Sequence, residues 1–160
     1  GNESVLNDFF IIKGKQVFTA KLTSNPSIGT FYKLTAEAKV SNQQEIVSEV
    51  ICSIDRKNKK AFIADKSIKL EFRNLGLSSA LSDIVALYCL QHDIYVIHGS
   101  ISPENIASQK ARKKMQNPIT RKEYPTFYRL KANGKFEVVT YLKELPLKVK
   151  LHNYMFRERL

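Results

Sequence analysis

The sequence has no tryptophan, only two cysteines and no long uncharged stretch, and each absence argues against a class of protein. Cys52 and Cys89 form no Cys-x-x-Cys pair and have no histidine at ligand spacing. We therefore expect two buried thiols rather than a disulfide or a zinc site, and no metal cofactor. Every window of about 18 residues contains a charge, so neither a membrane-spanning helix nor a secretory leader is expected. We expect a soluble, cytoplasmic protein with no membrane partner.

Acidic residues are also scarce. Lys and Arg number 26 against 15 Asp and Glu, which gives a formal net charge of +11. Such a surplus raises the potential over the surface and favours anionic partners. The basic clusters at residues 56–60, 110–114 and 121–122 lack the interleaved aromatic residues of a platform that stacks single strands. Composition thus leaves nucleic acid open as a partner without a motif to support it, beside an ordinary solvated basic surface.

The length of 160 residues suits one domain with a sizeable core. We expect a single domain over residues 1–145, followed by a C-terminal tail over 146–160. The sequence leaves open whether two copies form a homodimer.

Strand patterns dominate the first 72 residues. Residues 1–16 have no strong period, and they fit a short helix, an edge strand or a loose arm. Residues 31–40 alternate between apolar and polar side chains, which is the period of a half-buried strand. The runs at 46–54 and 61–72 are rich in β-branched and aromatic residues. The pattern predicts a meander of antiparallel strands.

Helical spacing of apolar residues begins at Leu77 and continues to about His92. The short apolar run at 94–98 then indicates a strand that is covered on both faces. A helix between two such strands implies a right-handed crossover and a parallel pair.

A second helix is predicted to begin at Ser102, which can cap it, with Pro103 at the first helical position. Helical spacing gives this helix two faces. The predicted inward stripe consists of Ala107, Ala111 and Met115. Another face carries Asn105, Ser108 and Arg112.

Two apolar runs at 126–130 and 136–142 flank an Asn-Gly pair, which is a strong hairpin signal. The elements together predict a mixed α/β (α+β) sheet with an antiparallel N-terminal meander, a central β-α-β-α unit and a C-terminal hairpin. One parallel pair is expected inside a largely antiparallel sheet.

The segment from the strand at 68–72 into the helix at Leu77 is a candidate anion site. A strand followed by a glycine-containing turn and a helix aims several free backbone N–H groups at one point. Phosphates bind at such points more than other anions do.

Two motifs in this region resemble those of the GNAT superfamily, the N-acetyltransferases that use acetyl-coenzyme A. The first is Arg73-Asn74-Leu75-Gly76-Leu77-Ser78, which resembles Arg/Gln-x-x-Gly-x-Gly/Ala in all but its last position. The second, Pro103-Glu104-Asn105-Ile106-Ala107-Ser108, is similar to a motif of ribosomal-protein acetyltransferases. The resemblance covers residues 60–142 and implies a GNAT-like fold, acetyl-CoA as cosubstrate and an unknown amine acceptor.

The resemblance also implies a set of cofactor-binding residues. The turn amides would hold the diphosphate of coenzyme A, and Arg73 would assist, although a surface arginine here can also cap a strand end. The pantetheine arm would run along the strand that holds Ile68 and Leu70. Asn105 and Ser108 would face the cofactor, although Asn105 also suits an ordinary helix start. The full set is Ile68, Leu70, Arg73, Asn74, Leu75, Gly76, Leu77, Ser78, Ser79, Asn105 and Ser108.

The sequence departs from the family pattern at several places. Ser78 stands where glycine or alanine is usual, and Arg112 stands where many members have the tyrosine that protonates the thiolate. The Gly-Phe pair that usually closes the second helix is absent. Residues 6–30 leave no room for the two amphipathic helices that normally frame the acceptor.

The catalytic residues therefore stay unassigned. Acetyl transfer needs a group that removes a proton from the amine. The candidates for this base are Glu49, Asp65, Glu71 and His98, and those for an acid are Tyr124 and Tyr128. Two other functions remain open beside the active enzyme. One is a catalytically weak GNAT-like protein that binds coenzyme A or a partner, and the other is a basic nucleic-acid-associated module.

Overall fold

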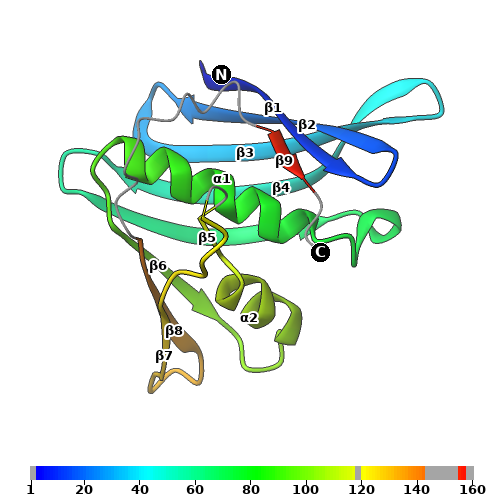
Figure 1. Cartoon of the computed structure of the whole chain (residues 1–160). Coiled ribbons are helices and arrows are strands. Elements are labelled where there is room, and N and C mark those ends of the chain that lie inside the picture. The colour runs from blue at the N-terminus through cyan, green and yellow to red at the C-terminus, as the bar shows by residue number, and fades with distance from the viewer. Residues whose placement is uncertain (1–2, 118–119, 143–154, 158–160) are drawn as a thin grey trace.

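The computed structural model describes residues 3–117, 120–142 and 155–157. Within these residues nine strands form one sheet, in the order β7-β8-β6-β5-β4-β3-β2-β1-β9 (Figure 1). The expected mixed sheet is confirmed. No helix in the described part of the chain is long and apolar enough to cross a membrane.

The N-terminal half is the predicted antiparallel meander. Its strands are β1 (Glu3–Lys13), β2 (Gln16–Asn25), β3 (Ile28–Val40), β4 (Gln43–Asp55) and β5 (Lys60–Ile68). Ser41 and Asn42 join β3 to β4 with φ angles of 50° and 64°, which is the two-residue hairpin turn that matches the strand twist. The N-terminal segment, for which the sequence left three alternatives, is a strand. Its pairing with β2 also excludes helices between β1 and β3.

The C-terminal half contains both helices and the hairpin. Its elements are a 3₁₀ turn η1 (Leu70–Phe72), α1 (Leu77–Gln91), β6 (Val96–Ile101), α2 (Ile106–Lys113), β7 (Thr126–Leu130), β8 (Phe136–Tyr141) and β9 (Met155–Arg157). The parallel pair β5–β6 and the hairpin β7–β8 are confirmed. A second parallel pair, β1–β9, was not predicted. Apart from β9, the tail over 146–160 lies outside the described residues.

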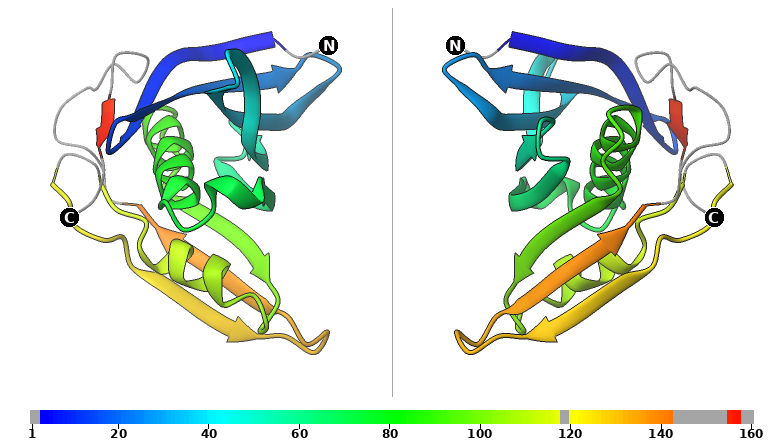
Figure 2. Two further views of the ribbon diagram at one scale, coloured as in Figure 1. Left: turned by 90° about the vertical axis from the view of Figure 1, so that its right-hand side faces the viewer. Right: turned by 90° about the vertical axis from the view of Figure 1, so that its left-hand side faces the viewer.

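Helix α1 lies at the centre of the core. All its residues except Ser78 and Gln91 are buried. Figure 2 shows α1 between the meander strands on one side and β6 to β8 on the other. This explains why its apolar residues extend round most of the helix, because it is covered on more than one face. Cys52 and Cys89 belong to this core as free, buried thiols, as predicted.

Two predicted boundaries were wrong. The strand expected to reach Phe72 ends at Ile68, because the pairing with β4 ends at the Ser48–Ile68 pair, and Leu70–Phe72 then forms the 3₁₀ turn. The second helix begins at Ile106 rather than at Ser102, because the side-chain oxygen of Asn105 accepts the Ser108 N–H at 3.0 Å and caps it.

The predicted inward face of this helix was wrong in one position. Ala111 and Met115 are buried, but Ala107 is exposed. Arg112 is the second buried residue of α2.

Candidate binding cleft

Strands β5 and β6 pair over only three residues and then separate. Their parallel register ends where Ile63 meets Gly99. On the other side of β5, Ile51 pairs with Asp65 and Cys52 with Ile63, so Ala64 is an extra residue that forms a bulge. The bulge bends β5 at the point where the two strands part. The backbone of β5 beyond Ile63 therefore offers an edge that β6 does not occupy.

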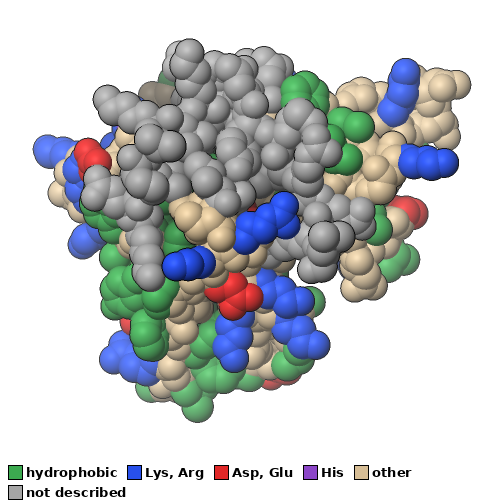
Figure 3. All heavy atoms as spheres, viewed as in Figure 1, with side chains coloured by type: hydrophobic (Ala, Val, Ile, Leu, Met, Phe, Trp, Pro, Cys, Tyr) green, Lys and Arg blue, Asp and Glu red, His purple; other side chains and the backbone are tan. Residues whose placement is uncertain are grey.

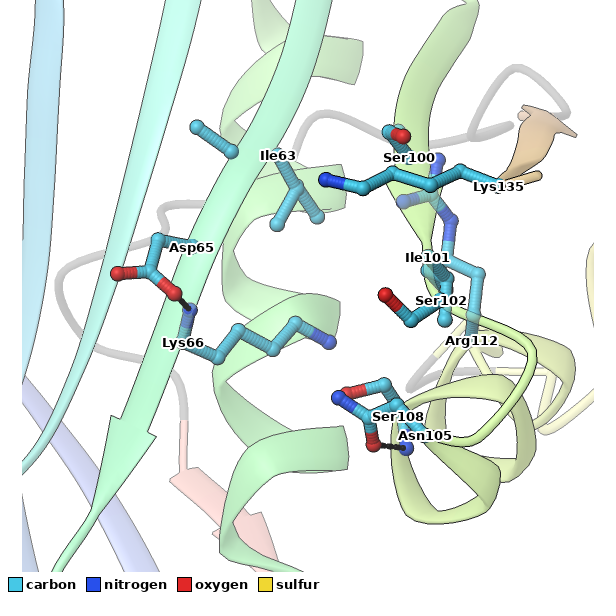
Figure 4. Close-up of a pocket in the computed structure, with 12 residues that line it drawn as sticks. Ile63, Asp65, Lys66, Ser100, Ile101, Ser102, Asn105, Ser108, Arg112 and Lys135 are labelled. Carbon is cyan, nitrogen blue, oxygen red and sulfur yellow. Dashed lines mark hydrogen bonds between the residues drawn. The ribbon is translucent and has the colours of Figure 1, made fainter. Parts of the chain in front are cut away.

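The separation of the strands leaves a cleft of about 160 Å³ (Figure 4). Its walls come from β5, β6, the start of α2 and the β7–β8 turn. The lining residues are Ile63, Ala64, Asp65, Lys66, Gly99, Ser100, Ile101, Ser102, Asn105, Ser108, Arg112 and Lys135. The lining is mainly polar, so the cleft suits a ligand rich in hydrogen-bonding groups.

The glycine turn before α1 has the geometry that its sequence predicts. Gly76 is the N-cap of α1 with a φ of 74°, a left-handed conformation that favours glycine. The first intrahelical hydrogen bond runs from the Ala80 N–H to the Gly76 carbonyl at 3.1 Å. The amides of Leu77, Ser78 and Ser79 precede this bond and lie at the positive end of the helix.

The turn is also open to ligands. Residues 73–76 are exposed, Ser78 is partly exposed, and the first turn of α1 contains no acidic residue. The turn that leads into the predicted anion site is thus exposed, and the first turn of the helix carries no negative charge.

Lys13 lies directly over this turn, a position that was not predicted. Its Nζ is 3.1 Å from the position that a Cβ on Gly76 would occupy. Lys13 is the last residue of β1, and the β1–β2 hairpin brings it to the helix start. A pairing between distant segments is needed to find this cation, which is why the local motif did not reveal it.

Arg112 is buried beside the cleft, with a side-chain exposure of 2%. Its Nε donates to Thr140 Oγ1 on β8 at 2.7 Å, and its Nη2 donates to the Ile97 carbonyl on β6. Burial lowers the pKa of Arg112, but the group stays protonated near neutral pH. In place of the tyrosine that the sequence resemblance implies, this position thus holds a cation that ties α2 to the sheet.

Lys66 extends from β5 into the cleft (Figure 4). Its Nζ donates to Ser82 Oγ on α1 at 3.0 Å. Burial and the charge of Arg112 lower the pKa of Lys66 to about 8, and Asp83 opposes this shift. Lys66 was not predicted as a site residue, because an alternating strand pattern cannot show that β6 moves away from it.

Only part of the predicted cofactor-binding set lines the cleft. Asn105 and Ser108 do so, together with Arg112 from the same helical face. The Asn105 oxygen is occupied in capping α2. Arg73 is exposed, and its Nε donates to the Ile68 carbonyl at 3.3 Å, so it caps the end of β5. Leu70 is 72% exposed on the 3₁₀ turn and lines no strand edge.

Asp65 is the one predicted base that lines the cleft in the described structure. Its Oδ1 accepts the Lys66 backbone N–H at 2.9 Å. Glu49 lies 3.7 Å from Lys33 on the neighbouring strand, and Glu71 is exposed on the 3₁₀ turn. His98 belongs to the paired part of β6 and is not in the lining.

Neither predicted acid lines the cleft. The Tyr128 hydroxyl donates to the Gln109 carbonyl at 2.7 Å and holds the hairpin against α2. Tyr124 is buried in the core, where burial raises its pKa. A tyrosine that protonates a ligand in the cleft is therefore not found at either position.

Comparisons with known proteins identify the fold. No family model matches the sequence, and no curated protein matches it. Solved structures do match it at low identity. The NatC complex bound to Gag peptide and CoA aligns with a TM-score of 0.55 and 15% identity, over 69% of this chain and 71% of that chain.

Two further matches agree. The GNAT domain of PAT from S. lividans has a TM-score of 0.53 and 14% identity, over 74% of this chain and 65% of that chain. The ribosomal-protein-S18-alanine N-acetyltransferase from Escherichia coli has a TM-score of 0.50 and 9% identity, over 71% of this chain and 68% of that chain. The chain has the GNAT fold. The matches do not distinguish the ribosomal-protein type that the second motif resembles.

Proposed function

We propose that this chain is an acetyl-CoA-dependent N-acetyltransferase that acts on a primary amine. The observation that carries the proposal is the exposed helix start at Gly76 beside a parallel strand pair that opens at a bulge. The first feature suits a diphosphate and the second suits a chain of amides. The low-identity matches to acetyltransferases support the same assignment.

The diphosphate of the cofactor would lie at the start of α1. The amides of Leu77, Ser78 and Ser79 would donate to it, and charge strengthens such hydrogen bonds. The turn residues Asn74 and Leu75 would border it. Lys13 adds a full positive charge above Gly76 and would neutralise part of the diphosphate.

The pantetheine arm would follow the free edge of β5. Its amides can pair with the backbone beyond Ile63 as an additional strand would. This path lies earlier in the chain than the predicted one along Ile68 and Leu70. Ser108 would border the arm from α2, and Asn105 would act mainly through its capping of that helix.

The cleft can assist transfer without a dedicated tyrosine. The amine nitrogen attacks the thioester carbonyl, the C–S bond breaks, and the nitrogen gives up a proton. Lys66 and Arg112 disfavour a charged ammonium in the cleft, so the acceptor would bind as a neutral amine. The same cations would stabilise the oxyanion and the departing thiolate. Asp65, whose carboxylate points away from Lys66 in Figure 4, would accept the proton through water.

The proposal is tested by Ser78→Asp, measured by calorimetric titration with coenzyme A. An aspartate in the first turn of α1 is expected to stabilise the helix by about 0.3–1 kcal/mol, yet it would repel the diphosphate. We therefore expect a higher unfolding temperature and a loss of coenzyme A binding. The control is Ser27→Asp, which adds the same charge in the turn that joins β2 to β3. Equal affinities for the two variants would contradict the proposed site.

Catalysis is tested separately by thiol release from acetyl-CoA with a panel of primary amines. Release that depends on the amine supports the enzyme. Tight coenzyme A binding without release would instead support the second candidate, a GNAT-like binding protein. The observation that favours this second candidate is Arg112 in place of the family tyrosine.

A further inference from the structure

The cleft contains an unusual excess of positive charge. Lys66 and Lys135 point into it from opposite walls, and the Arg112 guanidinium lies at its back (Figure 4). The lining thus contains three cationic side chains and one carboxylate, Asp65, which points away from them in Figure 4. The Asp65 carboxylate accepts a hydrogen bond from the backbone N–H of Lys66 rather than from any of the three cationic side chains.

None of the three cations has an acidic partner within 4.0 Å among the residues that the structure describes. Arg112 donates to a hydroxyl and a carbonyl, and Lys66 donates to a hydroxyl. Basic side chains at the surface, such as those over α2 in Figure 3, are neutralised by water and salt. Arg112 is 98% shielded from solvent, so water and salt do not neutralise its charge. A buried charge without a counterion is costly, which suggests that the counterion comes with the ligand.

We propose that the cleft between β5 and β6 binds a carboxylate group of the substrate, held by Lys66, Lys135 and Arg112. The inference rests on the proposed function and specifies the substrate class. The carboxylate has two sources in an acyl transfer: the far end of a dicarboxylic acyl chain on coenzyme A, or the amine acceptor itself. A guanidinium and two ammonium groups recognise either one in the same way.

Two features make a carboxylate a better occupant than an apolar acyl chain or a bare amine. The remaining lining includes Ser100, Ser102 and Ser108, whose hydroxyls suit a hydrated or hydrogen-bonded oxyanion. A positively charged amine without a carboxylate would meet three like charges. The phosphates of the cofactor have a separate place at the start of α1, so they do not supply this counterion.

The first test uses succinate as the probe, followed by NMR through the amide shifts of Gly99 and Ser100. Succinate should produce saturable shifts that its neutral analogue succinamide does not. Lys66→Met and Lys135→Met should each bind succinate about tenfold more weakly, because each loses one charge-assisted contact. The matched control is Lys131→Met in the same β7–β8 turn, which removes an equal charge outside the cleft and should bind as the wild type does.

The second test identifies the source of the carboxylate by turnover. In the acyl arm, succinyl-CoA is compared with butyryl-CoA, which has the same chain length without the charge. In the acceptor arm, β-alanine is compared with propylamine, using acetyl-CoA as donor. We expect a preference of about tenfold or more for the charged compound in one arm, and that arm names the source.

The two proposals fail in different ways. Succinate shifts that equal those of succinamide, or succinate binding that Lys131→Met weakens as much as Lys66→Met does, would overturn the carboxylate site. Turnover without a charge preference in either arm would also overturn it. Absence of coenzyme A binding with intact, Lys66-dependent succinate binding would overturn the acetyltransferase and leave the anion site standing.

Discussion

The guanidinium of Arg112 occupies the space that a side chain on Gly99 would need. Arg112 Nη1 is 2.8 Å from the position of a Cβ at Gly99, closer than real Cβ contacts come. Two hydrogen bonds, to Thr140 and Ile97, hold the guanidinium in place. The departure from the family pattern in α2 is therefore matched by a glycine on β6, and the two residues form one structural unit.

Gly99→Ala is expected to lower the free energy of unfolding by about 2 kcal/mol, because the added methyl group forces the buried guanidinium away from its hydrogen-bond partners. Denaturant titration measures the loss. Gly29→Ala is the control, since no atom lies within 4 Å of its Cβ position. If Gly99→Ala costs no more than Gly29→Ala, the guanidinium moves freely and the two residues are not coupled.

Lys66→Met should stabilise the protein at neutral pH by about 1–2 kcal/mol, because an apolar side chain of similar length needs no hydration. The expected gain is smaller than the free energy that corresponds to the full pKa shift, because Lys66 is only partly shielded from solvent. The variant also loses the hydrogen bond to Ser82, which lowers the gain further. Thermal and denaturant unfolding at pH 7 give the difference. A less stable variant would show that the Lys66 contacts outweigh its burial.

The stability difference should depend on pH in a definite direction. The pKa of Lys66 falls from 10.5 to about 8 on folding, so the unfolded chain binds more protons between these values. Wild-type stability therefore gains from raising the pH through this window, and Lys66→Met lacks that gain. The groups around Lys66 are Arg112, Asp83, Asp65 and Lys135. We expect the gap between the proteins to be largest below pH 8 and to close toward pH 10.5.

How much of the site could be predicted depends on how local each feature is. The turn at Gly76 is set within a few residues, so a sequence motif finds it, whereas the cap of α2 was predicted at Ser102 and lies at Asn105. Arg112 was noticed because it breaks a pattern, but its burial depends on Gly99 and Thr140, which lie on other strands. Strand and helix periodicity gave the sheet and α1 because the burial of α1 dominates the core.

The missed features all depend on register or on contacts between distant segments. The bulge at Ala64 is one residue in a run that reads as continuous strand, and only the pairing with β4 shows it. Lys13 and Lys135 reach the site from two different hairpins. Their sequence surroundings are those of ordinary turns, so the charge of the cleft could not be read from the chain.

Gly76→Ala should separate backbone strain from ligand binding. Its φ of 74° and that of Gly134, 82°, are both left-handed, so alanine at either position is expected to cost about 1 kcal/mol of stability. Only at Gly76 would the methyl group also meet Lys13, at 3.1 Å, whereas nothing lies within 4 Å at Gly134. Calorimetry should therefore show weaker coenzyme A binding for Gly76→Ala and unchanged binding for Gly134→Ala. Parallel losses in both variants would mean that stability, rather than the turn, controls the affinity.

Lys13→Met tests whether the cation above Gly76 contacts the diphosphate. We expect coenzyme A to bind about tenfold more weakly, because one charge-assisted contact is lost, and pantetheine, which has no phosphate, to bind as before. Lys15→Met is the matched control, since Lys15 is exposed in the same β1–β2 turn. The difference between the two variants should shrink as salt is added, because Lys13 is only partly buried. If both variants weaken coenzyme A equally, the effect comes from the general positive field of the protein. In that case Lys13 does not touch the cofactor, and the amides of α1 hold the diphosphate alone.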